Sequence, residues 1–280
     1  MTAELIEDMD EAEYHSHSAL SATGMKHILR SPLHYRQAMD HRVERKTFDT
    51  GNAIHAKVLG VGAGVIEIPE SMLSKSGSTG TNDARAFIED SRASGLIPLK
   101  AAAVGVVNAA AEAVLSNRKA RHLLELPGRT ELSMFATDPK TGAQFRGRLD
   151  RLTDSQIPID LKSTSDARRH KVQRSIGDFG YDTQAETYRE LARLVLGVEP
   201  APMQLIFVES DPPHEVRVVQ LAHEDWIAVG RMKMRAALDL YAECMSTGNW
   251  PGEDDDSDEI ESIEPLPYYL TINEHLEEAS

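Results

Sequence analysis

Two adjacent β-strand patterns in the middle of the chain carry charged residues that strands usually lack. The stretch GRLDRLTDSQIPIDLKS places Asp150 at the end of the first pattern and Asp160 and Lys162 in the second. Because strands are depleted in aspartate, its presence at these positions indicates a role other than packing. Side chains two residues apart in a strand point to the same face, so Asp160 and Lys162 stand side by side while Ile159 and Leu161 face the packed side.

The two aspartates predict a metal site. A short hairpin separates Asp150 from Asp160, so the two carboxylates can converge on one point with Lys162 beside them. An oxygen-rich site of this kind suits Mg²⁺ or Mn²⁺. An ordinary interpretation stays open, because Asp–Lys pairs on strands are usually solvated and Asp150 with Arg151 could form a plain salt bridge.

Three further features favour the metal site. Glu131 begins the first strand of the same region and offers a third carboxylate. Gln184 and Tyr188 are four residues apart in a helical pattern, so they share one face. His55 lies just inside a helix that begins with glycine and is a possible nitrogen ligand. Each has an ordinary alternative, since a helical histidine is more often a surface residue and a Gln/Tyr pair is often amphipathic decoration.

The flanking patterns predict an α/β fold in which a central mixed β-sheet is flanked by helices, with a helical N-terminal part. Alternating apolar residues bounded by Pro, Gly, Asp and Ser turns predict the strands, and apolar residues at helical spacing predict the helices. We expect strands at residues 130–138, 144–153, 157–164, 202–210 and 215–222. We expect a helical pattern over residues 16–40 that Pro32 breaks, helices at 50–60, 83–95, 183–197 and 223–248, a long Ala-rich helix at 99–126, and a loop at 74–82.

Composition sets limits on the partner and the compartment. The net charge of −15 is unevenly distributed: removing the 17 acids of the two ends from the total of 45 leaves 28, against 30 Lys and Arg that all lie between Lys26 and Arg235. The body can therefore bind a polyanion. We expect an acidic tail over residues 1–14, one domain over 15–250 and an acidic segment over 251–280.

Cys244 is the single cysteine, which excludes a disulfide framework, a Cys-pair zinc site and an iron–sulfur cluster within one chain. No apolar run approaches the ~18 residues of a membrane span, and the acidic N-terminus lacks the apolar core of a signal peptide. The cytoplasm is the expected compartment.

Taken in order, GNAIH, Glu131, GRLD, IDLKS and QAETY resemble the PD-(D/E)XK nuclease superfamily. More narrowly, the chain is similar to the RecE-type exonucleases (exodeoxyribonuclease VIII), which are related to phage λ exonuclease and the RecB nuclease domain. The opening YHSHSALSATGMKHILRSPLHY and the closing NWPGEDDD and PLPYYL resemble the same family, so the resemblance covers nearly the whole chain. One departure is that the "PD" is not contiguous with D-x-K, because Asp150 sits in GRLD.

The resemblance implies a role for each matching residue. Lys162 would orient and polarise the attacking water, and Gln184 and Tyr188 match the RecB-type Q-x-x-x-Y helix that positions the active site and the DNA strand. One or two Mg²⁺ ions, or Mn²⁺, would be bound. The implied metal ligands are His55, Asp150, Asp160, the main-chain carbonyl of Leu161 and, for a second ion, Glu131.

Basic residues on both sides of the site are candidate DNA contacts. A cluster directly after Lys162 predicts the rim of a phosphate-binding groove, although a solvated loop is an equal alternative for any one of its arginines. Arg30 and Arg36 are candidates to hold a terminal 5′ phosphate, because the planar guanidinium gives bidentate contacts. The predicted DNA-binding set is Arg30, Arg36, Arg148, Arg168, Arg169, Lys171 and Arg174.

The resemblance implies a metal-dependent exonuclease that digests the 5′-ended strand of linear double-stranded DNA and leaves 3′ overhangs for recombination. It also implies a RecT-like single-strand annealing partner, a phage or prophage source, and a ring-shaped homo-oligomer, a trimer or tetramer, that encloses DNA. Two alternatives remain: an endonuclease or structure-specific nuclease on the same fold, and a DNA-binding module that has lost catalysis.

Overall fold

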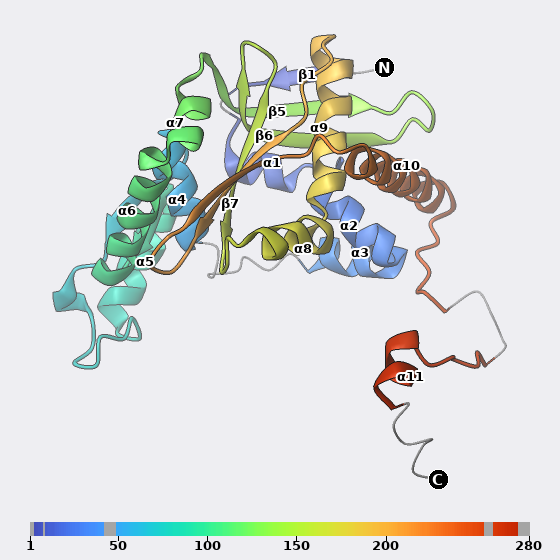
Figure 1. Ribbon diagram of the computed structural model, residues 1–280. Coiled ribbons are helices and arrows are strands. Elements are labelled where there is room, and N and C mark those ends of the chain that lie inside the picture. Colours follow the sequence, from blue (N-terminus) through green and yellow to red (C-terminus); the bar gives the residue numbers. More distant parts are fainter. Residues whose placement is uncertain (1–2, 8, 42–48, 255–259, 274–280) are drawn as a thin grey trace.

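A seven-stranded mixed sheet forms the middle of the molecule (Figure 1). The computed structural model describes residues 3–7, 9–41, 49–254 and 260–273. Six strands follow the order β1-β5-β6-β7-β8-β9, and the short β2 pairs with β6. The strands are β1 Ala3–Ile6, β2 Leu20–Ser21, β5 Gly128–Thr137, β6 Gln144–Thr153, β7 Pro158–Thr164, β8 Gln204–Glu209 and β9 Val216–Gln220.

The sheet contains both strand directions. β5 and β6 form an antiparallel hairpin, β7 and β8 are parallel, and β9 runs antiparallel to β8. A parallel pair needs a long crossover connection, which here consists of helices α8 (Arg169–Phe179) and α9 (Tyr181–Leu196). The predicted α/β fold with a central mixed sheet is therefore confirmed.

Helices cover both faces of the sheet (Figure 1). Helices α2 (Ala22–Arg30), α9 and α10 (Glu224–Thr247) pack on one face, and α4 (Asp49–Leu59), α6 (Ala101–Ser116) and α7 (Arg118–Glu125) on the other. Strand β8, which lies between β7 and the edge strand β9, consequently alternates between two cores: Leu205 and Phe207 join the first, and Ile206 and Val208 join the second. A strand that is buried on both faces has a nearly continuous apolar sequence, as this one does.

The remaining elements lie outside the seven-stranded sheet. Two of them, β3 and β4, form a parallel pair that the sequence patterns did not predict. Each of these strands has four residues, which is too few for an alternating pattern to distinguish a strand from a loop. These elements are α1 Glu11–Ser16, α3 Pro32–Asp40, β3 Gly64–Glu67, the 3₁₀ turn η2 Glu70–Met72, α5 Asn82–Ala93, β4 Leu96–Leu99 and α11 Pro267–Asn273.

The long helix that was predicted over residues 99–126 is two helices, so that prediction is wrong in its extent. Asn117 lies between α6 and α7 with extended backbone geometry. Its side chain accepts hydrogen bonds from the backbone N–H groups of Lys119 and Ala120, both at 3.1 Å. Asparagine favours this N-cap role over a position inside a helix, so a new helix begins here.

The helical segment is broken at Pro32, as predicted. Ser31 ends α2, and its hydroxyl accepts a hydrogen bond from the backbone N–H of His34 at 3.2 Å. Pro32 then begins α3, where a proline is favoured because its missing N–H has no intrahelical partner. The proline therefore separates two helices rather than ending the helical region.

The two ends depart from the expected tails. Residues 3–6 are the edge strand β1, which pairs antiparallel with β5, and α1 packs Tyr14 against the protein. At the other end, α11 projects from the body (Figure 1) and exposes Tyr268, Tyr269 and Leu270. Residues 255–259 and 274–280 of the expected acidic segment lie outside the described residues. Among the helices described, none has the length and apolar character that a membrane crossing requires.

Candidate active site

The site lies where β7 separates from β6. The two strands pair at only two positions, Arg151↔Ile159 and Leu152↔Pro158, whereas β7 remains paired with β8 as far as Thr164. Beyond Ile159 the sheet therefore opens on one side of β7. A diverging pair of strands exposes side chains and backbone groups that a continuous ladder would cover.

The side chain of Asp150 bridges this opening. Its Oδ2 accepts a hydrogen bond from the backbone N–H of Leu161 at 2.8 Å. The same oxygen lies 3.3 Å from Nδ1 of His55, which α4 supplies from the other side of the opening. Asp150 thus connects β6, β7 and α4 at one point. The structure therefore brings together three predicted site residues: His55, Asp150 and Leu161.

Asp160 and Lys162 lie on the opposite face of β7 from Ile159 and Leu161, as predicted. Oδ2 of Asp160 is 2.6 Å from Nζ of Lys162, and Oδ1 accepts a hydrogen bond from Nε2 of Gln184 at 3.1 Å. Nε2 of Gln184 also donates to the hydroxyl of Tyr188 at 2.8 Å. The predicted Gln/Tyr pair of α9 therefore holds the Asp160 carboxylate.

Tyr181 is a site residue that the sequence interpretation missed. Nζ of Lys162 lies 4.5 Å from the centre of the Tyr181 ring, a distance at which a cation is attracted to an aromatic face. The only available signal was spacing, because Tyr181 precedes Gln184 by three residues and so shares its side of the helix. The ring and the Asp160 carboxylate together fix the position of the Lys162 ammonium group.

Burial and like charges perturb the pKa values here. Burial, followed by repulsion from Asp150, raises the pKa of Asp160 to about 6. For Lys162, burial alone would lower the pKa, but Asp160, Tyr181 and Asp150 together outweigh burial and the net pKa is raised. The lysine is therefore held as a cation, while the carboxylates gain from any further positive charge placed between them.

Glu131 completes the acidic set from β5. It lies opposite Asp150, next to the pair Leu132↔Leu149, but it does not join the regular ladder and its φ of 50° is in the left-handed region. Such strain in a residue other than glycine occurs often at functional sites. Burial, and then the charge of Asp150, raises the pKa of Glu131 to about 7, while Arg148 lies 3.8 Å from its Oε2.

These residues fit a divalent cation in their chemistry. Carboxylate oxygens, a main-chain carbonyl and an imidazole are suitable ligands for Mg²⁺ or Mn²⁺. Oδ2 of Asp160 is buried and lies 2.6 Å from Nζ of Lys162, and burial and then the charge of Asp150 raise the pKa of Asp160. A cation between the two carboxylates would offset the repulsion between them.

The side chains are not already arranged as a coordination shell. Within the described ranges, no group of three or more His, Cys, Asp or Glu side chains has the spacing to hold a metal ion. The reason lies in the pairing, because Asp150 is turned toward His55 and Asp160 toward Lys162. The ligand set therefore stays a prediction.

Gly147, the glycine of GRLD, makes room for the helix that carries Gln184. A Cβ atom at this position would lie 2.5 Å from the Tyr188 ring and 2.8 Å from the Leu191 side chain. These distances are far shorter than van der Waals contact, so only glycine fits without a shift. The glycine thereby fixes how closely α9 approaches the strand that carries Asp150.

The predicted DNA contacts fall into different surroundings. Arg148 is 13% exposed, stacks 4.4 Å from the Tyr14 ring, and donates to Ser133 and to the backbone oxygen of Met9. These contacts hold Glu131 and the N-terminal segment in place. The role of Arg148 as a DNA contact stays a prediction.

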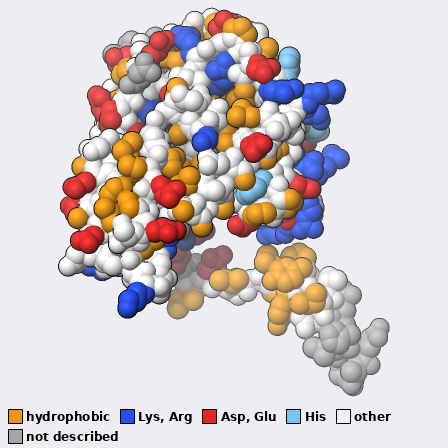
Figure 2. All heavy atoms as spheres, turned by 90° about the vertical axis from the view of Figure 1, so that its left-hand side faces the viewer, with side chains coloured by type: hydrophobic (Ala, Val, Ile, Leu, Met, Phe, Trp, Pro, Cys, Tyr) orange, Lys and Arg blue, Asp and Glu red, His pale blue; other side chains and the backbone are white. Residues whose placement is uncertain are grey.

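The basic cluster after Lys162 is largely helical. Arg168 is the N-cap of α8 and pairs with Asp166 at 2.6 Å, while Arg174 pairs with Asp178 at 3.2 Å. Arg169 and Lys171 are exposed on the first turn of the same helix. Figure 2 shows that on the face containing α4 to α7, Lys and Arg side chains gather along one edge. The α8 cluster remains a candidate rim for a phosphate backbone.

Arg30 and Arg36 lie on α2 and α3. Arg30 is exposed near the end of α2. Arg36 is paired with Asp40 at 3.1 Å, and its guanidinium lies 5.9 Å from the Trp250 ring. No contact of either residue with His55, Asp150 or Asp160 connects it to the acidic cluster within the described chain. Their predicted role in holding a 5′ phosphate stays a prediction.

Comparison with solved structures supports the fold. A crystal structure of a candidate exonuclease from Eubacterium rectale has a TM-score of 0.58 at 12% sequence identity, over 95% of this chain and 96% of that chain. At that identity the likeness concerns the fold alone. A second structure, SSO0001, has a TM-score of 0.29 at 12% identity over 71% of this chain and 87% of that chain, which carries no argument. No curated protein matches the chain.

A family model provides the assignment. The model describes a PDDEXK-like domain of unknown function, DUF3799, and it matches residues 21–264. This range includes every residue of the His55, Glu131, Asp150, Asp160 and Lys162 cluster, together with α9. It excludes β1, α1 and α11. The chain therefore belongs to the DUF3799 family of PDDEXK-like domains.

Proposed function

We propose that this protein is a divalent-metal-dependent nuclease that hydrolyses phosphodiester bonds of DNA. One observation carries the proposal: at the place where β7 leaves β6, Asp150 binds the backbone N–H of Leu161, which lies between Asp160 and Lys162 in the chain, and Gln184 of α9 binds Asp160. The PDDEXK-like family and the fold of the candidate exonuclease from Eubacterium rectale support the same reaction class. Two neighbouring carboxylates alone repel an anionic phosphodiester. A cation bound between them would supply the positive charge that this substrate needs in order to bind.

The residues that would hold the metal are His55, Asp150, Asp160 and the Leu161 carbonyl, with Glu131 at a second ion. A Mg²⁺ or Mn²⁺ ion bound there lowers the pKa of a coordinated water and offsets charge on the leaving oxygen. These are the two requirements of phosphodiester hydrolysis, because the attacking group must be deprotonated and the leaving group is an alkoxide.

The protein's own contribution centres on Lys162. Its raised pKa keeps Nζ protonated, so it serves as a hydrogen-bond donor and a positive charge rather than as the base that removes a proton. Held between Asp160 and the Tyr181 ring, Nζ can orient the attacking water and stabilise charge on the phosphoryl oxygens. Gln184 keeps Asp160 in place while Tyr188 fixes the amide of Gln184.

The finer proposal is a 5′→3′ exonuclease on linear double-stranded DNA that leaves 3′ overhangs for strand annealing. The resemblance to RecE-type exonucleases motivates this polarity, together with a RecT-like partner, a ring-shaped homo-oligomer and a bacterial or phage setting. The exposed Arg169 and Lys171 on α8 offer contacts for the phosphate backbone near the site. An endonuclease on the same fold is the rival, because it would use the same ligands.

One experiment separates these possibilities. Linear duplexes labelled at each 5′ or 3′ end, nicked circles and closed circles are incubated with the protein and Mg²⁺ or EDTA. The proposal expects loss of 5′-end label as mononucleotides, no cleavage of closed circles, and no reaction in EDTA. Asp160→Asn should abolish cleavage, while Asp154→Asn, an exposed aspartate in the neighbouring turn, should leave it unchanged. Cleavage of closed circles would establish the endonuclease, and full activity of Asp160→Asn would reject the site.

A further inference from the structure

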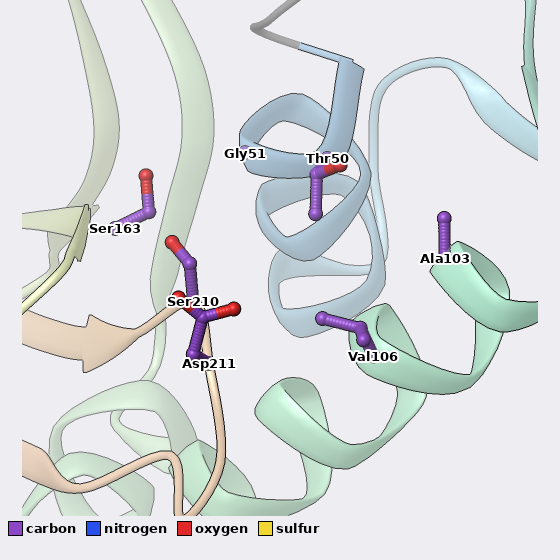
Figure 3. Close-up of a pocket in the computed structure, with 7 residues that line it drawn as sticks. All are labelled: Thr50, Gly51, Ala103, Val106, Ser163, Ser210 and Asp211. Atoms are coloured by element: carbon purple, nitrogen blue, oxygen red, sulfur yellow. The ribbon is translucent and has the colours of Figure 1, made fainter.

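A pocket of about 350 Å³ lies beside the acidic cluster, on the α4 and α6 side of β7 (Figure 3). It stands at the carboxyl ends of the parallel strands β7 and β8, which is where open α/β sheets usually bind ligands. Ser163 of its wall directly follows Lys162, and Gly51 lies one helical turn before His55 on α4. The pocket therefore adjoins the residues that we propose to be catalytic.

The lining of the pocket combines hydrogen-bonding groups with a small apolar wall. The hydroxyls come from Thr50, Ser163 and Ser210, and the side chains of Ala103 and Val106 on α6 provide the apolar wall. Asp211 adds a carboxylate from the loop after β8. In Figure 3 the side chains of Thr50, Val106, Ser210 and Asp211 point toward the same space.

The chemistry of this lining selects a nucleoside rather than a phosphate. The Asp211 carboxylate repels an anion but accepts hydrogen bonds from base N–H groups or a sugar hydroxyl. The three hydroxyls can donate or accept, which suits base carbonyls and ring nitrogens. Ala103 and Val106 offer contact to the flat, apolar face of a base. An occupant with both polar edges and apolar faces fits these walls.

The pocket is bounded by well-fixed backbone. The backbone N–H of Ser210 donates to the carbonyl of Thr164 at 2.8 Å, so it continues the pairing of β7 with β8. The next turn is closed by a bond of 3.0 Å from the N–H of His214 to the carbonyl of Asp211. At the other wall, a Cβ on Gly51 would come within 3.3 Å of the Ser163 hydroxyl. The pocket is thus largely formed before any ligand binds.

From these observations we infer that the pocket binds the nucleoside adjacent to the phosphodiester that reacts. The inference rests on the proposed nuclease function and deepens it by naming a subsite. β7 separates two sides of the site, with Lys162 and α8 on one side and the pocket on the other. A DNA strand crossing the end of β7 would place a phosphate near Lys162 and its neighbouring nucleoside in the pocket.

The test combines a protein variant whose side chain fills the pocket with a DNA substrate that lacks the base. Ala103→Phe places a ring in the pocket, whereas Ala102→Phe puts the same ring on an exposed neighbouring position of α6. Each variant cleaves end-labelled linear duplexes that carry either a normal nucleotide or an abasic residue beside the first scissile bond. We expect the abasic substrate to be cleaved roughly tenfold more slowly by wild-type protein and by Ala102→Phe. Ala103→Phe should cleave both substrates equally slowly.

A binding measurement makes the result independent of catalysis. Saturation-transfer NMR with the uncharged nucleoside deoxyadenosine in EDTA should show contact of the adenine protons with wild-type protein and with Ala102→Phe, but not with Ala103→Phe. Asp211→Ala, an exposed substitution, should weaken the same signal if Ala103→Phe proves unfolded by circular dichroism. Equal cleavage of both substrates by the wild type, or adenine contact that persists in Ala103→Phe, overturns the subsite. Absence of all cleavage by wild-type protein, with adenine contact intact, instead overturns the nuclease proposal.

Discussion

Replacing Glu131 by glutamine should stabilise the metal-free protein at alkaline pH. Burial and the Asp150 charge raise the pKa of Glu131 from an ordinary 4.5 to about 7. A carboxyl group whose pKa is raised in the folded state contributes its full stability below pH 4.5 and loses it as the pH rises through 7. The wild type should therefore be weakened by about 3 kcal/mol at pH 8 relative to a neutral side chain, and by less than about 1 kcal/mol at pH 5.

The assay is urea unfolding followed by circular dichroism, at pH 5 and at pH 8 in EDTA. Glu131→Gln should exceed the wild type in free energy of unfolding mainly at pH 8, and Mg²⁺ should shrink that gap because a cation relieves the same repulsion. Glu112→Gln, at an exposed glutamate of α6, is the control and should show no such pH dependence. A Glu131→Gln variant that is equally or less stable at pH 8 would refute the electrostatic reasoning.

Three other substitutions test separate parts of the account. Lys162→Met should lower the rate constant for DNA cleavage by about 10²–10³-fold while DNA affinity in Ca²⁺ changes less than threefold; equal losses in both would make Lys162 a binding residue. Gly147→Ala should reduce the free energy of unfolding by about 1–3 kcal/mol, because its Cβ would lie 2.5 Å from the Tyr188 ring, and unchanged urea unfolding would show that α9 moves freely. Burial alone would raise the pKa of Asp138, but hydrogen bonds from Arg235 and Thr141 lower it to about 2. A carboxyl group with a lowered pKa stabilises the folded protein above its ordinary pKa of 3.8, and this stabilisation is lost as the pH falls toward 2. Asp138→Asn should therefore reduce the free energy of unfolding by about 2 kcal/mol at pH 7 and by progressively less below pH 4. A reduction that does not depend on pH would assign the effect to packing.

The strands around the site could be predicted because their signals are local. Residues 144–153 were expected as a strand and form β6 with those bounds, since alternating side chains and flanking turn residues define both ends. The same reasoning placed Asp160 and Lys162 on the face opposite Ile159 and Leu161. The spacing of Gln184 and Tyr188 was likewise sufficient to predict that they act together.

The rest depends on packing between distant segments. The separation of β7 from β6 cannot be read from either strand, because it follows from how β8 and the two helical layers position β7. The left-handed backbone of Glu131 arises only where β5 meets Asp150. For Arg148 too, the local sequence does not show its surroundings. In the structure, α1 places the Tyr14 ring against its guanidinium, and the backbone oxygen of Met9 accepts a hydrogen bond from it.

The pocket beside β7 could not have been predicted from the sequence either. Its walls come from α4, α6, β7 and the loop after β8, and its residues are small side chains without a recognisable motif. Hydroxyl and methyl groups acquire a role only when separate elements bring them around one space. Sequence patterns therefore predicted the candidate catalytic side chains, while the structure supplied the shape that surrounds them.

Anomalous diffraction from crystals of the protein soaked in Mn²⁺ tests the central claim most directly. The account predicts a peak within about 2.3 Å of carboxylate oxygens of both Asp150 and Asp160, with Lys162 beside it and Asp150 turned away from His55 or sharing the ion with it. A peak bound by only one of these carboxylates, or occupied metal sites confined to the acidic ends of the chain, would contradict it.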